Sequence, residues 1–376
     1  MNLNETLVSR YLYRTPYVDD SARFKEEIIS KTVRPYQVEI QPGPTGNKIC
    51  WLECPFCYGR SAEDTGERLS KSRYIELIKE IADGGVKKVI FSGWATDPLF
   101  YQHIDDLVET ALESGLIIGF NTRALKVNDR LIDLITRQSV PEESYISVSV
   151  DSGDDTSYSR VHTETMSTGL YRRVYDNVQK LKVNRDNTGG PLFISTTYLI
   201  NQNNSDSNLI LKYIDDYQNI GVDLIRFSFP QIPRGSKEGE RDLVLSFPER
   251  ASLREKLKPI IQRGNTGRSK ILFFDGEDLI YEKRTTPCYS RFVYPAIGFD
   301  GWLYHCSQSA GPNFHATALG NLAEKGFWEL FYNYNISDID DYLRRMTKCF
   351  DQVDCRCDRK EHTLNSSISM SLVVKP

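Results

Sequence analysis

Three cysteines in the first sixth of the chain, Cys50, Cys54 and Cys57, combine residue type and spacing in the way most suited to chemistry. They lie in the loop after the first predicted strand, where α/β folds place functional groups. Three thiolates with this spacing can bind three irons of a cubane 4Fe–4S cluster and leave the fourth iron open. A zinc site would need a fourth ligand, usually from a second close pair, which Cys355 and Cys357 could supply. The spacing and the loop favour iron–sulfur chemistry.

The elements that must position these cysteines alternate regularly along the chain. Apolar, often β-branched runs bounded by Gly, Pro or Asn predict strands, at 36–41, 87–92, 116–120, 145–150, 192–200 and 222–228. Apolar residues three and four apart predict helices between and after them, at 70–83, 101–114, 128–138, 168–182, 207–219 and 248–263. Six such units predict an α/β fold with a parallel sheet, open or curled into a partial barrel, that binds ligands at the carboxyl ends of its strands.

Composition excludes several classes of protein. The 376 residues include 47 Lys and Arg against 51 Asp and Glu, a net charge of −4. This balance argues against nucleic acid or an anionic membrane as the main partner. No run approaches 18 apolar residues, and the N-terminus is too polar for a signal peptide, so we expect a cytoplasmic chain. There, eight cysteines indicate metal ligands or catalytic groups more than disulfides.

The alternating pattern stops near residue 265 and divides the chain into three expected parts. Residues 1–35 form an N-terminal extension that is too short for an independent domain. Residues 36–265 form the barrel, and residues 266–376, which hold five of the eight cysteines, form a smaller cysteine-rich domain.

The first cysteine motif, Cys50-Trp-Leu-Glu-Cys54-Pro-Phe-Cys57, resembles the Cys-x3-Cys-x-aromatic-Cys signature of the radical S-adenosylmethionine (radical SAM) superfamily, with Phe56 at the aromatic position. The resemblance implies a partial (β/α)6 barrel, a 4Fe–4S cluster, and S-adenosylmethionine chelated to its open iron. It implies one-electron cleavage of this cofactor to methionine and a 5′-deoxyadenosyl radical, which abstracts hydrogen from the substrate. An electron donor such as flavodoxin or ferredoxin would then be a partner.

The resemblance also implies cofactor contacts at the ends of the second and third strands. Residues 91–99 stand where the family has a Gly-Gly-Glu-Pro segment, with Gly93 retained and Asp97 in place of the Glu. Asn121 and Thr122 resemble the Thr-Asn pair of the family. The alternatives are an ordinary turn containing Gly and Pro at the first site and a polar strand end at the second.

Four more cofactor positions follow from the same resemblance, three near the fourth and fifth strands and one directly after the third cysteine. Ser149 would touch the cofactor, and Arg160 would bind its carboxylate, because a planar guanidinium can donate two parallel hydrogen bonds to a carboxylate. Asn201 would meet the ribose hydroxyls, although an Asn there can also turn the chain. Tyr58 would offer its backbone to the adenine edge. The alternative for Arg160 is a solvated loop arginine.

The C-terminal part contains a second motif. Cys288, Gly301 and Cys306, spaced by twelve and four residues, resemble the start of the SPASM or twitch module, which holds auxiliary clusters. Residues 299–306 would form a hairpin with an Asp-Gly turn, and residues 319–322 resemble the segment that follows it. The resemblance implies one auxiliary 4Fe–4S cluster. The alternative is that the two cysteines are core residues of a small domain.

The remaining cysteines, Cys349, Cys355 and Cys357, depart from the Cys-x2-Cys ending of that module. With Cys288 and Cys306 they give five thiols for the four positions of a cluster. One thiol would be free, and a thiol near a carbon radical can donate a hydrogen atom. Because two residues separated by one rarely both reach the same cluster, we expect the donor to be Cys355 or Cys357.

The expected function is hydrogen abstraction from a small polar metabolite, such as an amino acid, nucleoside, amino sugar or cyclitol, in a biosynthetic pathway. The alternative is a maturase that modifies a peptide or protein. Many peptide maturases of the family carry a leader-binding domain before the barrel, and about 35 residues are too few for one. The motifs leave open whether the enzyme is an oxidoreductase, an epimerase or a lyase.

Overall fold

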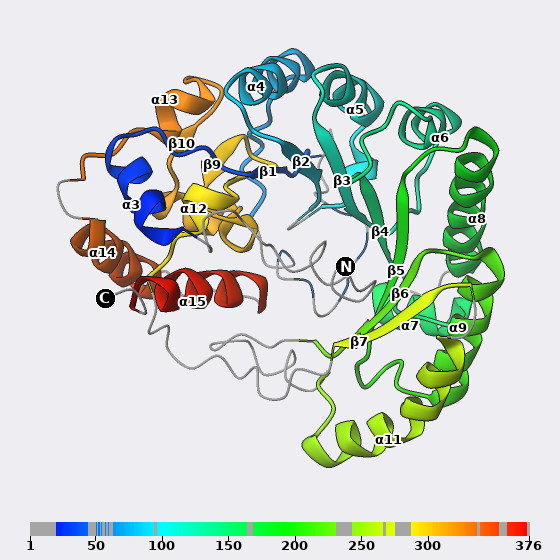
Figure 1. Ribbon diagram of the computed structural model, residues 1–376. Coiled ribbons are helices and arrows are strands. Elements are labelled where there is room, and N and C mark those ends of the chain that lie inside the picture. Colours follow the sequence, from blue (N-terminus) through cyan, green and yellow to red (C-terminus); the bar gives the residue numbers. More distant parts are fainter. Residues whose placement is uncertain are drawn as a thin grey trace.

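The computed structural model describes residues 20–43, 50, 52, 54, 57, 59, 63–93, 96–163, 168–230, 243–265, 268–274, 287–336, 339–352 and 359–373. In these residues ten strands form one sheet, in the order β10-β9-β8-β1-β2-β3-β4-β5-β6-β7. The sheet curves around an interior, and α4, α5, α6, α8 and α9 follow its outer side (Figure 1). The architecture is therefore α/β, with a parallel core.

The predicted units are all present. The six strands are β1 (Gln37–Ile40), β2 (Lys88–Phe91), β3 (Ile117–Thr122), β4 (Tyr145–Ser149), β5 (Phe193–Leu199) and β6 (Leu224–Ser228). Each is parallel to the next. The six predicted helices are α4 (Lys71–Asp83), α5 (Ile104–Glu113), α6 (Asp129–Thr136), α8 (Leu170–Thr188), α9 (Ser207–Ile220) and α11 (Phe247–Gly264). Two further short helices, η1 (Pro98–Phe100) and α7 (Asp155–His162), follow β2 and β4.

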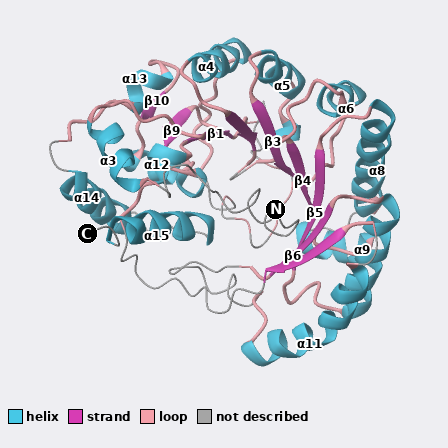
Figure 2. Cartoon of the chain, viewed as in Figure 1, coloured by secondary structure: helices cyan, strands magenta, loops and turns pink. Residues whose placement is uncertain are grey.

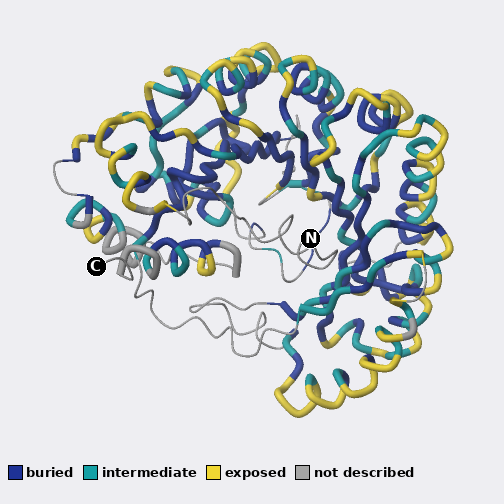
Figure 3. Tube along the Cα trace, in the orientation of Figure 1, coloured by how far each residue is buried: buried dark blue, intermediate teal, exposed yellow. Residues whose placement is uncertain are grey.

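The helices pack on the outer face of the sheet through large apolar and aromatic side chains. Tyr213 of α9 contacts Tyr198 of β5 and Phe227 of β6, with ring centroids 4.9 and 5.7 Å apart. The opposite sides of the helices face solvent, whereas the strands are buried (Figure 3). Polar side chains cap the first turns of α4, α6, α7 and α9; these are Ser70, Asn128, Asp154 and Asp206. Each such cap contributes about 1 kcal/mol.

The inner face of the sheet is polar. Since side chains alternate along a strand, residues next to Tyr198 and Phe227 point inwards. The strand register then places the inward-pointing residues of one strand directly beside those of the next strand. Its polar members include Gln37, Glu39, Asn121, Ser147, Ser149, Ser195, Thr197 and Arg226. The barrel thus encloses hydrogen-bonding groups rather than an apolar core.

The sheet continues past the six predicted units on both edges. A seventh strand, β7 (Lys270–Phe274), is parallel to β6, beyond the point where the sequence periodicity stops. On the other edge, β8 (Ala296–Ile297) is parallel to β1. β9 (Trp302–Tyr304) and β10 (Gly320–Asn321) then add antiparallel neighbours. Residues expected in a separate small domain thus extend the barrel sheet, and the division at residue 265 stays a prediction.

The predicted hairpin at residues 299–306 is confirmed. β8 and β9 pair around the turn Gly298–Gly301, where the Gly301 N–H donates to the Gly298 carbonyl at 3.0 Å. Gly301 has a φ of +83°, a conformation that favours glycine. Asp300 Oδ1 accepts a hydrogen bond from the Trp302 N–H at 3.2 Å. The Asp-Gly dipeptide therefore forms the turn that its sequence indicates.

The N-terminal helix α3 (Ser21–Ile29) lies among C-terminal helices (Figure 2). Its neighbours α14 (Ile339–Gln352) and α15 (Arg359–Val373) contact it directly. Phe24 packs at its centre against Tyr289 and against Phe292 of α12 (Ser290–Val293). The remaining short helices are η2 (Ser307–Ser309), η3 (Pro312–Thr317) and α13 (Phe327–Phe331). Of the helices that the structure describes, none combines the length and apolar character needed to cross a membrane.

Candidate active site

The first three cysteines lie together in the loop after β1. Cys54 is buried, Cys50 and Cys57 are partly buried, and the Cys57 N–H donates to the Cys54 carbonyl at 3.0 Å. No three Cys, His, Asp or Glu side chains in the described ranges already stand at metal-binding separation. Cys50 interacts electrostatically with both Cys54 and Cys57, so the three thiols are neighbours.

Burial raises the pKa of two of the three cysteine thiols. Burial, with the nearby charge of Asp97, raises the pKa of Cys50 to about 12. Burial also raises the pKa of Cys54 to about 11, against the opposing effect of the Arg123 guanidinium. Iron binds thiolates, so loading would release these protons. The set of three thiols fits a cubane cluster with one open iron.

Asp97 links the ends of β2 and β3 beside these cysteines. Its Oδ1 accepts hydrogen bonds from the Leu99 N–H at 3.0 Å and from Thr122 Oγ1 at 2.8 Å. Its Oδ2 accepts from the Arg123 N–H at 2.6 Å. Burial raises the pKa of Asp97, and these hydrogen bonds oppose that rise. Two predicted cofactor residues, Asp97 and Thr122, are thus brought into direct contact.

The neighbouring predicted residues have different surroundings. A Cβ on Gly93 would lie 1.5 Å from the Thr96 carbonyl oxygen, so this turn requires glycine. Asn121 lies on the inward face of β3 and is exposed. It is therefore available to a ligand inside the barrel, whereas Thr122 on the other face is occupied by Asp97.

A buried group that the sequence did not predict surrounds Cys54. Arg123 Nη1 donates to the Ser149 carbonyl at 3.2 Å and to Asp151. Arg123 Nη2 lies 3.8 Å from Cys54 Sγ, and His162 Nδ1 lies 3.3 Å from the same sulfur. The sequence gives His162 no metal-type spacing, and its position depends on α7, which the periodicity does not predict. The signal in the sequence that could have located this group is the position of Arg123 and Asp151, which come shortly after the third and fourth predicted strands.

The cofactor residues predicted at the ends of β4 and β5, Ser149 and Asn201, already form hydrogen bonds within the protein. The Ser149 hydroxyl accepts a hydrogen bond from Thr197 Oγ1 at 3.2 Å and is half-buried. Asn201 is fully buried. Its Oδ1 accepts from the Asn203 N–H at 2.9 Å and its Nδ2 donates to the Leu199 carbonyl at 3.1 Å. These contacts match the alternative in which Asn201 turns the chain.

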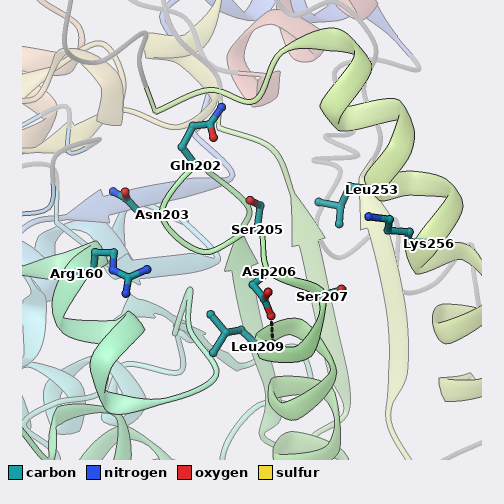
Figure 4. A pocket seen from close by; sticks show the side chains of 9 residues that line it. All are labelled: Arg160, Gln202, Asn203, Ser205, Asp206, Ser207, Leu209, Leu253 and Lys256. Atoms are coloured by element: carbon teal, nitrogen blue, oxygen red, sulfur yellow. Dashed lines mark hydrogen bonds between the residues drawn. The ribbon is translucent and has the colours of Figure 1, made fainter.

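Arg160 is exposed on α7 and points into a pocket at the carboxyl end of β5 (Figure 4). The pocket is lined by Arg160, Gln202, Asn203, Ser205, Asp206, Ser207, Leu209, Leu253 and Lys256. Asp206 is engaged in capping α9, where it accepts from the Asn208 and Leu209 N–H groups. The Arg160 guanidinium therefore stands open to an anionic group, and its role toward the cofactor carboxylate stays a prediction.

The second pair of cysteines flanks the strands that join β1. Cys288 precedes α12 and Cys306 follows β9, and both are buried. Arg291 is buried nearby, where its Nη2 donates to the Phe331 carbonyl at 2.8 Å. Burial lowers the pKa of Arg291, while charge on Cys288 would raise it. The side chain of Cys349, and all of Tyr58, Cys355 and Cys357, lie outside the described residues.

The chain resembles known proteins both in sequence and in fold. Residues 47–214 match the radical SAM superfamily model. The structure is similar to Streptococcus suis SuiB bound to S-adenosylmethionine, with 16% identity, 84% of this chain and 69% of that chain covered, and a TM-score of 0.59. It is also similar to native anSMEcpe with bound AdoMet, with 12% identity, 91% and 100% covered, and a TM-score of 0.57. No curated protein sequence matches. At these identities the solved structures demonstrate a shared fold.

Proposed function

Since this chain is a radical SAM enzyme, we propose that it cleaves S-adenosylmethionine at a 4Fe–4S cluster held by Cys50, Cys54 and Cys57, and abstracts hydrogen from a small polar metabolite. When bound, the cluster supplies the electron that cleaves the cofactor. A flavodoxin or ferredoxin would deliver that electron, and a reducing cytoplasm would keep the eight cysteines as thiols.

The observation that carries the catalytic proposal is the convergence of three thiols and Asp97 at the carboxyl ends of the first strands. The charge of Asp97 and of the other two cysteines acts on Cys50, which places these groups within electrostatic reach of one another. Parallel α/β folds bind ligands at this end of the sheet. Solved structures of the same fold, SuiB and anSMEcpe, contain S-adenosylmethionine.

The polar inner face supports a polar substrate. Asn121 is exposed on the inward side of β3, and Ser149 and Arg226 lie half-buried on the same side of β4 and β6. Glu39 is deeper, where it accepts hydrogen bonds from Ser92 and from Gln41 Nε2. A surface lined with hydrogen-bonding side chains favours a ligand that can itself form hydrogen bonds.

A peptide substrate is the second candidate, because the fold is also that of SuiB bound to the precursor peptide SuiA, with a TM-score of 0.58. A peptide could present a polar side chain to the same inner face. The two candidates differ in which compounds accelerate cofactor cleavage.

The test is cofactor cleavage by the reconstituted protein. The chain is loaded with iron and sulfide without oxygen and reduced, and 5′-deoxyadenosine is measured by mass spectrometry. We expect basal 5′-deoxyadenosine from S-adenosylmethionine, and at least a tenfold acceleration by one class of polar metabolite. Acceleration by peptides alone would replace the metabolite with the peptide alternative, and a cluster-loaded protein that forms no 5′-deoxyadenosine would refute the proposed function.

We further propose an auxiliary 4Fe–4S cluster at Cys288 and Cys306, completed by two of Cys349, Cys355 and Cys357. The described pair flanks the β8–β9 hairpin, which has the Asp-Gly turn expected for such a module. The third of those C-terminal cysteines, Cys355 or Cys357, would remain a free thiol and donate a hydrogen atom to the substrate radical.

A further inference from the structure

We propose that Arg123 and His162 donate hydrogen bonds to the Cys54 sulfur and thereby raise the reduction potential of the cluster. The inference rests on the proposed cluster at Cys50, Cys54 and Cys57. It assigns Arg123 and His162 a positioning and tuning role through Cys54, without contact to substrate.

Both side chains reach Cys54 from distant parts of the chain. Arg123 follows β3, and His162 is the last residue of α7. Arg123 Nη2 and His162 Nδ1 lie 3.8 and 3.3 Å from Cys54 Sγ. Cys54 is 6% exposed and His162 is fully buried, so water does not replace these contacts easily. Hydrogen bonds to sulfur have more effect in such a low-dielectric setting.

The direction of the hydrogen bonds follows from the donors available. Guanidinium groups only donate, and Arg123 Nη1 lies 3.2 Å from His162 Nε2. The Val150 carbonyl oxygen lies 3.1 Å from the same Nε2. With hydrogen on Nε2, the ring donates to Val150 and Nδ1 accepts from a Cys54 thiol. With hydrogen on Nδ1, the ring donates to sulfur and Nε2 accepts from Arg123.

Iron binding selects between these two tautomers. An iron-bound Cys54 sulfur is a thiolate without a hydrogen, so it can only accept. The hydrogen must then be on His162 Nδ1; in the neutral ring Nε2 accepts from Arg123 and no longer donates to the Val150 carbonyl. Both Arg123 and His162 thereby donate toward the cluster ligand.

Neighbouring groups hold this arrangement in place. Asp151 is 1% exposed, pairs with Arg123, and accepts at Oδ1 from the Leu199 N–H at 2.6 Å. The Tyr158 ring packs on His162 with centroids 4.4 Å apart. The geometry is therefore built from β3, β4, β5 and α7 together. Reduction adds negative charge to the cluster, so hydrogen bonds to its sulfur favour the reduced form.

The test measures the midpoint potential of the loaded cluster by an EPR-monitored redox titration of the full chain. His162→Phe keeps an aromatic ring beside Tyr158 and removes the N–H donor. At the midpoint potential of the wild-type cluster, we expect the ratio of reduced to oxidised cluster in His162→Phe to be about tenfold lower than in wild type. His162→Gln keeps an N–H donor, so its midpoint potential should lie between those of wild type and His162→Phe. His103→Phe, at the start of α5, is the matched control and should leave the potential unchanged.

The outcomes separate the possible failures. Equal potentials for wild type and His162→Phe would overturn the inference. If His162→Phe holds no iron while His162→Gln does, an N–H donor at position 162 is needed for Cys54 to hold iron, and this result supports the inference. If neither holds iron, Arg123→Lys decides, and an unchanged potential in that variant overturns it. A wild-type chain that binds no cluster at the first three cysteines refutes the proposed function itself, and the inference falls with it.

Discussion

Cys54 connects several parts of the candidate site. Its backbone carbonyl accepts from the Cys57 N–H, and its sulfur lies beside both His162 and Arg123. Through Arg123 it is joined to Asp97, whose carboxylate accepts from the Arg123 N–H. A change at Cys54 therefore tests the chemistry of the site with little effect on the sheet around it.

Cys54→Ala should abolish 5′-deoxyadenosine formation, because two thiolates cannot hold the cluster in place of three. The chain should stay folded, since the strands pair independently of this loop. The measurement combines 5′-deoxyadenosine by mass spectrometry with circular dichroism. Cys288→Ala is the control and should leave the barrel cluster intact. Undiminished cofactor cleavage by Cys54→Ala would contradict the assignment of this ligand.

Arg160→Ala should weaken binding of S-adenosylmethionine to the cluster-loaded chain about tenfold, because a charge-assisted pair with the cofactor carboxylate is lost. Equilibrium dialysis with labelled cofactor measures the effect. Lys256→Ala is the matched control, because it removes a second cation from the same pocket. An equal loss in both variants would show a general charge effect and remove the specific role of Arg160.

The residues of the site differ in how far their roles could be predicted. The cysteine spacing is local in the sequence and is sufficient to locate the loop. Asp97 and Thr122 follow two predicted strands, and their pairing depends only on those strands being neighbours. Arg123 directly follows a strand, which was an available signal, whereas His162 could not be predicted because it reaches Cys54 only through the direction of α7. Asn201 shows the converse, since strand-end polarity does not reveal whether a side chain serves its own loop.

Among the elements, long periodic segments were predictable and short ones were not. The helix α7 (Asp155–His162) is mostly polar and lacks an apolar stripe that would announce it. The strand β7 has five residues and follows a loop that begins at Asn265, directly after α11. β8 and β10 have two residues each, too few for any alternation. These elements form because longer ones already define the sheet edge.

The β8–β9 turn provides a test at the level of an element. Gly301→Ala should destabilise the protein more than Gly85→Ala, although both glycines have positive φ, +83° and +93°. A Cβ on Gly301 would lie 2.8 Å from Leu69 Cγ, whereas the space around Gly85 is open. Conformational strain costs each variant about 1–2 kcal/mol, and overpacking adds about 1–3 kcal/mol at Gly301. Thermal unfolding midpoints measure the difference, and equal midpoints would contradict the packing of this turn against Leu69.

For the whole molecule, the two cysteine groups belong to one continuous sheet. The first group follows β1, and the second group flanks β8 and β9, which extend the sheet from the other edge of β1. The first described helix, α3, packs on α14 and α15, so elements from early and late in the described chain lie together. The proposed clusters would thus share a frame without sharing ligands.

Simultaneous Cys50→Ala, Cys54→Ala and Cys57→Ala substitution should reduce the iron content of the reconstituted chain from about eight to about four per molecule. The remaining iron would belong to the auxiliary site, which keeps all of its thiols. Iron analysis with Mössbauer spectroscopy measures both the amount and the cluster type. A triple variant without iron would remove the auxiliary cluster from the account.

The position of β1 has a consequence for how the protein is made. Ile40 of β1 pairs with Phe91 on one side and with Ile297 on the other. During synthesis on the ribosome, one edge of β1 therefore stays unpaired until residues about 250 positions later have been made. At 5–20 residues per second this takes roughly 10–50 s. An open strand edge invites intermolecular pairing, so the nascent chain is vulnerable to aggregation throughout this interval. The cysteine loop follows that same strand, so its frame is complete only after Ile297 has been synthesised, and assembly of the proposed cluster belongs after that point.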